Sequence, residues 1–384
     1  MTTHSKMILV AAFCLGLTAA ALAQSDAVRA IYRASASIPT NVEGVYAYPA
    51  PPTGFNPLSA SDEELAAYGF PPRPDKVEDA HGYQVWARVM SMPTTRWFGE
   101  LKVRSNRSHP ATARLSQSQT DPTKFAASSG VTKNWSGVVN TLSSTSYSST
   151  KSFCCVAAEF VVPQPQQAFN GSGGNICDGD TDQAAFWVGQ GGFTIAGLNL
   201  GNQNNIAQSG VDIVAPCGDS NGSAYAWMEW YPANLVEFFP VSAGDDIYVS
   251  VNNTSSTTAT INLVDETGQH SVSVSLTAPS GVRLVGNEAE FVVERPYGDS
   301  KTPTGYYPLA NYIWSFWDYA RSKTFAKKYY YPGTTAASTY DISMTDDVGD
   351  QIISVPTVGT SGTLGLEGMF VQDQDCAQLI GCVP

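Results

Sequence analysis

The chain is 384 residues long and carries a formal net charge of −13 at pH 7. Its acidic residues lie mostly after residue 130, so nucleic acid is not an expected partner of that part. Beyond the N-terminus no segment approaches about 18 consecutive apolar residues, which argues against a membrane-spanning helix.

The first 23 residues have the pattern of a secretory signal peptide. Lys6 precedes an apolar run from Met7 to Ala20, and the small-x-small pattern Ala-Leu-Ala follows it at residues 21–23. We therefore expect residues 1–23 to be removed and the rest to be secreted as a soluble protein.

The remaining chain divides into two parts of different charge. Residues 24–130 hold 11 Lys and Arg against 10 Asp and Glu, a net charge of +1, whereas residues 131–384 hold 9 against 24, a net charge of −15. A linker rich in Ser, Thr and Ala, residues 111–132, joins them. We expect residues 24–130 to be a mostly irregular pro-region, held on the acidic domain partly by charge and released by cleavage between Lys124 and Lys133. The alternative is a flexible extension without an inhibitory role.

One short helix is predicted in this pro-region, in the segment SDEELAAYGFPPRPD. Ser61 is its N-cap, and Glu64 completes a capping box. Gly69 follows the end of the helix, and Pro71 and Pro72 prevent its continuation. Other helical signals before residue 130 are weak.

The second part has the pattern of an all-β domain. Short β-branched or aromatic segments alternate in polarity and are separated by Gly, Asn, Asp, Ser and Pro, without the spacing of βαβ units. This predicts an antiparallel sandwich or barrel over residues 131–384, with a possible helix only near YIWSFWDYARS. The segments are SGVVNTL, AAEFVVP, AFWVGQ, AWMEWYP, IYVSVNN, TINLVDE, SVSVSLT and AEFVVER.

Six cysteines remain after removal of the signal peptide, an even number in an oxidising compartment. Up to three disulfides are therefore possible, and the sequence does not choose among the pairings. We expect no metal and no cofactor, because no CxxC occurs and His270 is the only histidine after residue 130.

The inventory of catalytic groups is narrow. There is no HExxH motif and no GxSxG elbow, in which a helix would follow the nucleophile turn, and His270 lies in a predicted hairpin turn. The glycines of WVGQGGF are not followed by a helix, so a strand turn is expected rather than a phosphate site.

Carboxylates, amides and aromatic rings remain as candidate functional groups. In AEFVVERP the alternation places Phe291 and Val293 on one face and Glu290, Val292 and Glu294 on the other, and Glu229 lies among aromatic residues in AWMEWYP. Taken alone, such acids are more often solvent-facing residues of a half-exposed sheet.

Six segments in order resemble the glutamic peptidase family, the eqolisins: NWSGVV, AAFWVGQGG, IAQSGVD, AYAWMEWYP, SAGDDIYVSV and EAEFVVERP. The resemblance implies a concanavalin-like β-sandwich of two curved antiparallel sheets with the active site in a concave groove. It places the catalytic glutamine at Gln208 and the catalytic glutamate at Glu294. Trp187, Trp227 and Glu229 are then expected to line the groove.

The chain departs from the family pattern at three places. Gln190, Gly191 and Gly192 stand where members commonly have Ile-Asp-Gly, so an assisting aspartate is missing. Tyr225 replaces another aspartate. Residues from Tyr297 to Tyr331 diverge and are expected to form a longer loop at the cleft.

The resemblance implies a secreted acid endopeptidase, acting as a monomer on proteins and peptides, with its pro-region as intramolecular inhibitor. Glu294 would take a proton from water and return it to the leaving amine, while the Gln208 amide would stabilise the oxyanion at any pH. Two alternatives remain: a β-sandwich glycoside hydrolase that uses Glu229 and Glu294, and a non-catalytic carbohydrate-binding sandwich.

Overall fold

The computed structural model describes residues 26–105, 107–108, 113–115, 129–168, 179–195, 201, 204–218, 222–298, 300–302, 304–334, 339–349, 351–359 and 367–374. The expected signal peptide, most of the linker and Lys124 lie outside these residues. Among the described residues, no helix combines the length and the apolar character needed to cross a membrane.

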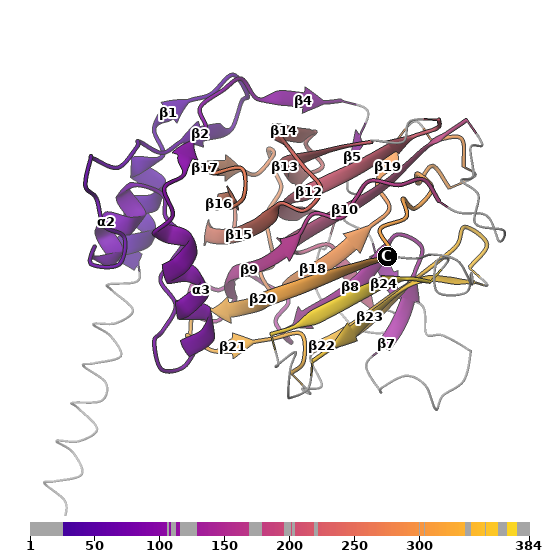
Figure 1. The fold of residues 1–384 in the computed structure, drawn as a ribbon. Coiled ribbons are helices and arrows are strands. Elements are labelled where there is room, and N and C mark those ends of the chain that lie inside the picture. The colour runs from indigo at the N-terminus through magenta and orange to yellow at the C-terminus, as the bar shows by residue number, and fades with distance from the viewer. Residues whose placement is uncertain are drawn as a thin grey trace, which may run out of the picture.

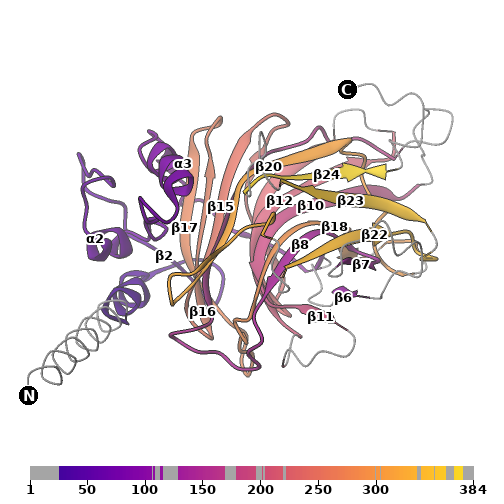
Figure 2. The same cartoon turned by 90° about the horizontal axis from the view of Figure 1, so that it is seen from below.

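The described part of residues 131–384 is almost entirely antiparallel β-sheet, folded over into two curved layers (Figures 1 and 2). The first layer consists, in spatial order, of β14 (Leu235–Val241), β13 (Ser223–Tyr231), β12 (Ile206–Pro216), β10 (Thr181–Gln190), β18 (Glu288–Glu294), β8 (Trp135–Thr141) and β22 (Thr339–Thr345). The second consists of β20 (Trp314–Thr324), β9 (Phe153–Val161), β15 (Asp246–Ser255), β16 (Thr258–Asp265) and β17 (His270–Thr277). β23 (Ile352–Val358) and β24 (Met369–Asp373) join the two layers at one edge. The predicted antiparallel sandwich is confirmed.

The main core lies between the layers and is formed by the alternate residues of each strand that point inward. Phe291 and Val293 of β18 pack there with Phe186 of β10, Val211 of β12 and Val249 of β15. Period-two alternation is therefore what separates this core from the opposite face of the first layer. That opposite face carries the polar residues that the sequence singled out.

The helices of residues 26–104 form an outer layer on the second sheet: a helix over residues 26–35, α2 (Asp62–Ala67) and α3 (Ala80–Met90). The same part contains the strands β1 (Ile38–Pro39), β2 (Val45–Ala47), β3 (Thr95–Arg96) and β4 (Lys102–Arg104). β2 and β3 pair with β17 of the second sheet, and β4 pairs with β14 at the edge of the first. Trp86 and Leu65 pack on Tyr248 and Tyr319 of the underlying strands. Figure 2 shows α2 and α3 beside β17, on the far side of the sandwich from β18 and β8.

Helix α2 begins and ends as the sequence predicts. The Ser61 hydroxyl accepts from the Glu64 backbone N–H at 3.1 Å, and the Glu64 carboxylate accepts from the Ser61 N–H at 2.7 Å. Gly69 has a φ of +69°, the left-handed conformation that glycine adopts readily. The helix over residues 26–35 and helix α3 were not predicted. In α3 a glycine, Gly82, lies in the first turn, which lowers the helical propensity of the segment.

Two expectations for the C-terminal third are wrong. The segment YIWSFWDYARS is not helical: it forms most of β20, which pairs with β9 and β24 in the second sheet. The segment from Tyr297 to Tyr331 is accordingly not one long loop at the cleft. Its first part, which includes β19 (Tyr297–Gly298), comes directly after strand β18.

The number of disulfides is lower than the three that the sequence allowed. Cys154 and Cys155 are free thiols on β9. Cys217 is disulfide-bonded, and its partner lies outside the described residues. Two free thiols among six leave room for at most two bridges.

Candidate active site

The strand register of the first layer brings the predicted site residues onto one face. Gln208 of β12 lies opposite Gly189 of β10 and opposite Glu229 of β13. Glu294 of β18 lies opposite Ala185 of β10 and Trp135 of β8. Residues that are paired across neighbouring strands point to the same side of a sheet.

Trp187 stands between the two predicted catalytic residues. Along β10, it is two residues before Gly189, the partner of Gln208, and two residues after Ala185, the partner of Glu294. Gln208 and Glu294 therefore lie diagonally across this indole, one on each side. Gln208, Glu294 and Trp187 are all fully buried in the full chain.

Glu294 is held by two N–H donors. The Trp187 indole Nε1 donates to Glu294 Oε2 at 2.8 Å, and the Asn134 amide donates to Glu294 Oε1 at 3.2 Å. Hydrogen bonds of this kind stabilise a negative charge on the carboxylate and fix its orientation. Asn134 was not predicted as a site residue, although it opens the quoted motif NWSGVV.

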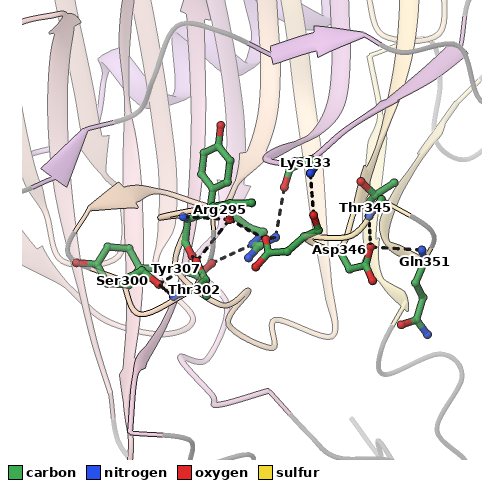
Figure 3. Close-up of polar contacts among 12 residues, drawn as sticks. Lys133, Arg295, Ser300, Thr302, Tyr307, Thr345, Asp346 and Gln351 are labelled. Atoms are coloured by element: carbon green, nitrogen blue, oxygen red, sulfur yellow. Dashed lines mark hydrogen bonds and ion pairs between the residues drawn. The ribbon is translucent and has the colours of Figure 1, made fainter.

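Arg295 fixes the chain on either side of this carboxylate (Figure 3). Its backbone N–H donates to the Asn134 carbonyl at 2.8 Å, and its guanidinium donates to the carbonyls of Tyr307 at 2.9 Å and Lys133 at 3.4 Å. The guanidinium also pairs with Asp347 at 2.9 Å. The end of β18 and the start of β8 are thereby tied together, which places Asn134 beside Glu294.

Gln208 has its own partner. Its amide Nε2 donates to Glu229 Oε2 at 2.9 Å, and both side chains are buried. This hydrogen bond assigns the amide orientation, because only the nitrogen end can donate to a carboxylate. Glu229 thus lies on the same sheet face as Gln208 and is in contact with it.

The replacement of an aspartate by Tyr225 creates a hydroxyl donor. The Tyr225 hydroxyl donates to Asp212 Oδ2 at 2.7 Å, and the two residues are opposite each other in register. Asp212 is also opposite Ala185, so it shares a row with Glu294. A tyrosine in this position satisfies a buried carboxylate without adding a second negative charge beside it.

Three tryptophans form the apolar surface around these groups. Trp135 meets Trp187 edge to face, with ring centroids 5.0 Å apart, and Trp227 belongs to the same buried cluster. Gly210 lies opposite both Trp187 and Trp227. A Cβ at Gly210 would lie 2.0 Å from the Phe186 carbonyl oxygen, so no side chain fits between the indoles. Trp187 and Trp227, the two tryptophans expected at the groove, therefore lie on the same sheet face as Gln208 and Glu294.

The glycine-rich segment after Trp187 is a tight turn, as expected. Gly191 and Gly192 have φ values of +100° and +92°, and β11 (Phe193–Ile195) follows at once. The Gly191 N–H donates to Glu290 at 3.2 Å, and the Phe193 N–H donates to Glu288 at 3.0 Å. The sequence placed Glu290 on this face but assigned it no partner, and Glu288 was not considered.

The described residues contain no group of three His, Cys, Asp or Glu side chains that could hold a metal ion. The chemistry available at this site is that of carboxyl groups, the carboxamides of Gln208 and Asn134, the Tyr225 hydroxyl and indole N–H donors. Fold and site together define a β-sandwich protein with an acid and an amide on an aromatic sheet face.

The profile of the Peptidase A4 family matches residues 133–362, which include every residue of this face named above. The chain therefore belongs to the Peptidase A4 family. The resemblance to glutamic peptidases that the motifs indicated is confirmed.

Two curated proteins illustrate the relationship. Scytalidopepsin B of Scytalidium lignicola is 35% identical over 118 residues, 30% of this chain and 41% of that protein. Aspergillopepsin-2 of Aspergillus niger is 30% identical over 151 residues, 36% of this chain and 50% of that protein. The matched segments thus span half or less of these relatives.

Solved structures of glutamic peptidases align over a larger part of this chain. Scytalido-glutamic peptidase with a transition state analog inhibitor aligns over 63% of this chain and 98% of that chain, with 22% identity and a TM-score of 0.46. Aspergilloglutamic peptidase from Aspergillus niger aligns over 50% of this chain and 99% of that chain, with 22% identity and a TM-score of 0.39.

Proposed function

We propose that this protein is a secreted endopeptidase that hydrolyses proteins at low pH, with Gln208 and Glu294 as its catalytic pair. The observation that carries the proposal is the position of these two side chains on one buried face, on either side of Trp187. Membership of a peptidase family supports the reaction class.

In this mechanism Glu294 acts first as a base. Its carboxylate, oriented by Trp187 and Asn134, takes a proton from a water molecule, and that water attacks the carbonyl carbon of the scissile peptide bond. The carboxyl group then returns the proton to the leaving nitrogen as the carbon–nitrogen bond breaks. Base and acid are the same group, so its protonation state is restored at the end of each cycle.

Gln208 supplies the oxyanion donor. Its amide nitrogen has two hydrogens, and since one is given to Glu229, the other is directed at the substrate oxygen on which negative charge develops. Loss of one such donor typically costs about 3–4 kcal/mol of transition-state stabilisation. The surrounding tryptophans exclude water and strengthen these contacts.

We infer further that residues 24–130 act as an intramolecular inhibitor. Two short strands from this part pair with strands at opposite ends of the catalytic face: β5 (Arg107–Ser108) with β19, which begins three residues after Glu294, and β6 (Ala113–Leu115) with β11, directly after the glycine turn. Arg104 precedes β5 in the sequence, and its guanidinium lies 5.4 Å from the centre of the Tyr225 ring. A segment attached at both ends of the groove face blocks access of a substrate chain.

Opposite charges contribute to this docking. Lys102 donates to Glu237 at 3.1 Å, Arg104 Nε donates to the same carboxylate at 2.8 Å, and Arg88 pairs with both Glu159 and Glu266. One pair has the reverse polarity, Asp79 with Arg321. Acid that neutralises the carboxylates of residues 131–384 weakens this charge complementarity, which supports release of residues 24–130 at low pH once the linker is cut.

The test of the proposed function is substrate choice. The purified protein, acidified to about pH 3, is incubated with denatured casein or haemoglobin and, separately, with a panel of glucans. The peptidase mechanism predicts peptide products only. Cleavage of a glucan without proteolysis would instead favour the alternative in which Glu229 and Glu294 are a glycosidase pair, and binding of a glucan without any cleavage would favour the non-catalytic alternative.

A further inference from the structure

Two carboxyl groups that the proposed mechanism does not use lie beside the catalytic pair. Glu288 and Glu290 are on β18, on the same face as Glu294, and both are fully buried. Each accepts one backbone hydrogen bond from the same turn, Glu290 from Gly191 and Glu288 from Phe193. The second oxygen of each, Glu288 Oε1 and Glu290 Oε2, has no hydrogen-bond partner.

No cation among the described side chains compensates these two acids. The residues opposite them on β8 are Thr141 and Val139, and the residue opposite Glu290 on β10 is Gly189. The next strand, β22, presents Tyr340, which packs on Phe193 with ring centroids 6.0 Å apart. β6 pairs with β11 through its backbone, and the side chain of its Arg114 lies outside the described part of the chain.

This environment favours the neutral form of both groups. Burial raises the pKa of Glu288 well above its ordinary value, against the effect of the Phe193 N–H. Burial likewise raises the pKa of Glu290, and the charge of Glu288 raises it further. Two buried acids with one another as nearest charge cannot both ionise without a large cost.

The turn that they hold is adjacent to Gln208. Gly189, the last residue before it on the catalytic face, is the register partner of both Gln208 and Glu290. On its other side the turn is tied to the second sheet, because the Gln190 amide donates to the Val251 carbonyl at 3.2 Å and accepts from Asn253. The turn therefore sets how β10 lies against the catalytic glutamine.

We propose that Glu288 and Glu290 are positioning residues that hold the 190–193 turn as neutral carboxyl groups, and that their ionisation at neutral pH opens this turn and disassembles the groove. The inference rests on the proposed function for its consequence in catalysis, but not for its structural part. On this proposal, the fold as well as the catalytic pair limits activity to acidic pH.

The sign of the effect follows from the direction of the shifts. Groups whose folded pKa lies above the unfolded value stabilise the fold fully below the unfolded value, about 4.3 for Glu, and lose this contribution as the pH rises through the folded value. The structure should therefore be most stable in acid and should open as the solution becomes neutral or alkaline.

The test compares the full chain with Glu288→Gln, Glu290→Gln and the double variant. Glutamine keeps the carbonyl oxygen that accepts from the turn but does not ionise. Far-ultraviolet circular dichroism and tryptophan fluorescence are recorded from about pH 3 to 9. We expect the pH midpoint of unfolding to rise by at least about one unit in the double variant and by less in each single variant.

Glu43→Gln is the matched control, because this exposed glutamate is remote from the groove. It should leave the midpoint unchanged. If the double variant also stays within about 0.3 unit of the wild type, the proposal is refuted. Neither readout requires peptidase activity, so this result is independent of whether the proposed function is right.

A second measurement covers the case in which the double variant does not fold. Infrared spectra of the wild type at about pH 5.5, where the fold is intact and exposed carboxyl groups are ionised, should contain the band of protonated carboxyl groups, and the single variants should each lose part of it. Equal band intensity in the wild type and both single variants would show that the two acids are ionised in the fold, which contradicts the proposal.

Discussion

Replacement of Trp187 by phenylalanine tests how the catalytic carboxylate is held. The substitution removes the indole N–H that donates to Glu294 Oε2 at 2.8 Å and leaves an aromatic ring on the sheet face. A hydrogen bond to a charged group is worth about 1.5–3 kcal/mol. If that energy orients Glu294 in the transition state, kcat/KM on casein near pH 3 should fall by about 10- to 150-fold.

The smaller ring also leaves a cavity in the buried aromatic cluster, so a control must separate packing from hydrogen bonding. Trp230→Phe provides it: Trp230 is equally buried one strand over from β12, faces the main core, and its indole nitrogen has no hydrogen-bond partner. We expect Trp230→Phe to lower the thermal midpoint while kcat/KM stays within about threefold of the wild type. Equal kcat/KM for the two variants, each checked for folding by circular dichroism, would refute the orienting role of Trp187.

Three further predictions follow from the fold and its charges. Activity on casein should peak between about pH 2 and 4.5, because the repulsion within the −15 charge of residues 131–384 is relieved there, and a peak at about pH 7 would count against the site. Pepstatin should inhibit poorly, and nanomolar inhibition would also count against the site. The double variant Lys102→Ala, Arg104→Ala should shorten the lag before activity appears at about pH 4, as added salt should in the wild type. Lys76→Ala, which removes a cation–π contact with Tyr83 of its own layer, should not. Burial and the neighbouring Glu159 raise the pKa of Glu266 to about 7, so its contribution to stability is present below about pH 4.5 and is lost as the pH rises through 7. Glu266→Gln should therefore reduce the change in thermal midpoint between about pH 5 and 8. An unaltered change would show that this carboxyl group is not responsible.

The alternation of residues in short strands predicted much of the sandwich. The split of β18 into a core face with Phe291 and a polar face with Glu294 is the one that the sequence indicated. Such periodicity reports which side of a strand is buried, but not which strands are neighbours. The placement of Gln208 and Glu294 about Trp187 depends on a register between β12, β10 and β18, and the sequence indicated it only through the family motifs.

Contacts between distant segments account for what was missed. Asn134 is 160 positions from Glu294 in sequence, and the Glu288 and Glu290 contacts to the turn span almost 100 positions. The segment that forms β20 combines aromatic and charged residues at spacings that also suit a helix. Pairing with β9 and β24 determines its conformation, because local propensity is weaker than the backbone hydrogen bonds of two neighbouring strands.

The central claim is that Gln208 and Glu294 form one catalytic unit, and the most direct measurement is kcat on casein near pH 3 for Gln208→Ala, Glu294→Gln and the double variant. Loss of the oxyanion donor should lower kcat at least about 100-fold, and loss of the base should do at least as much harm. The double variant should be little worse than the poorer single variant, because residues that act together are strongly non-additive. A folded Gln208→Ala protein that retains kcat within about threefold of the wild type would contradict the account.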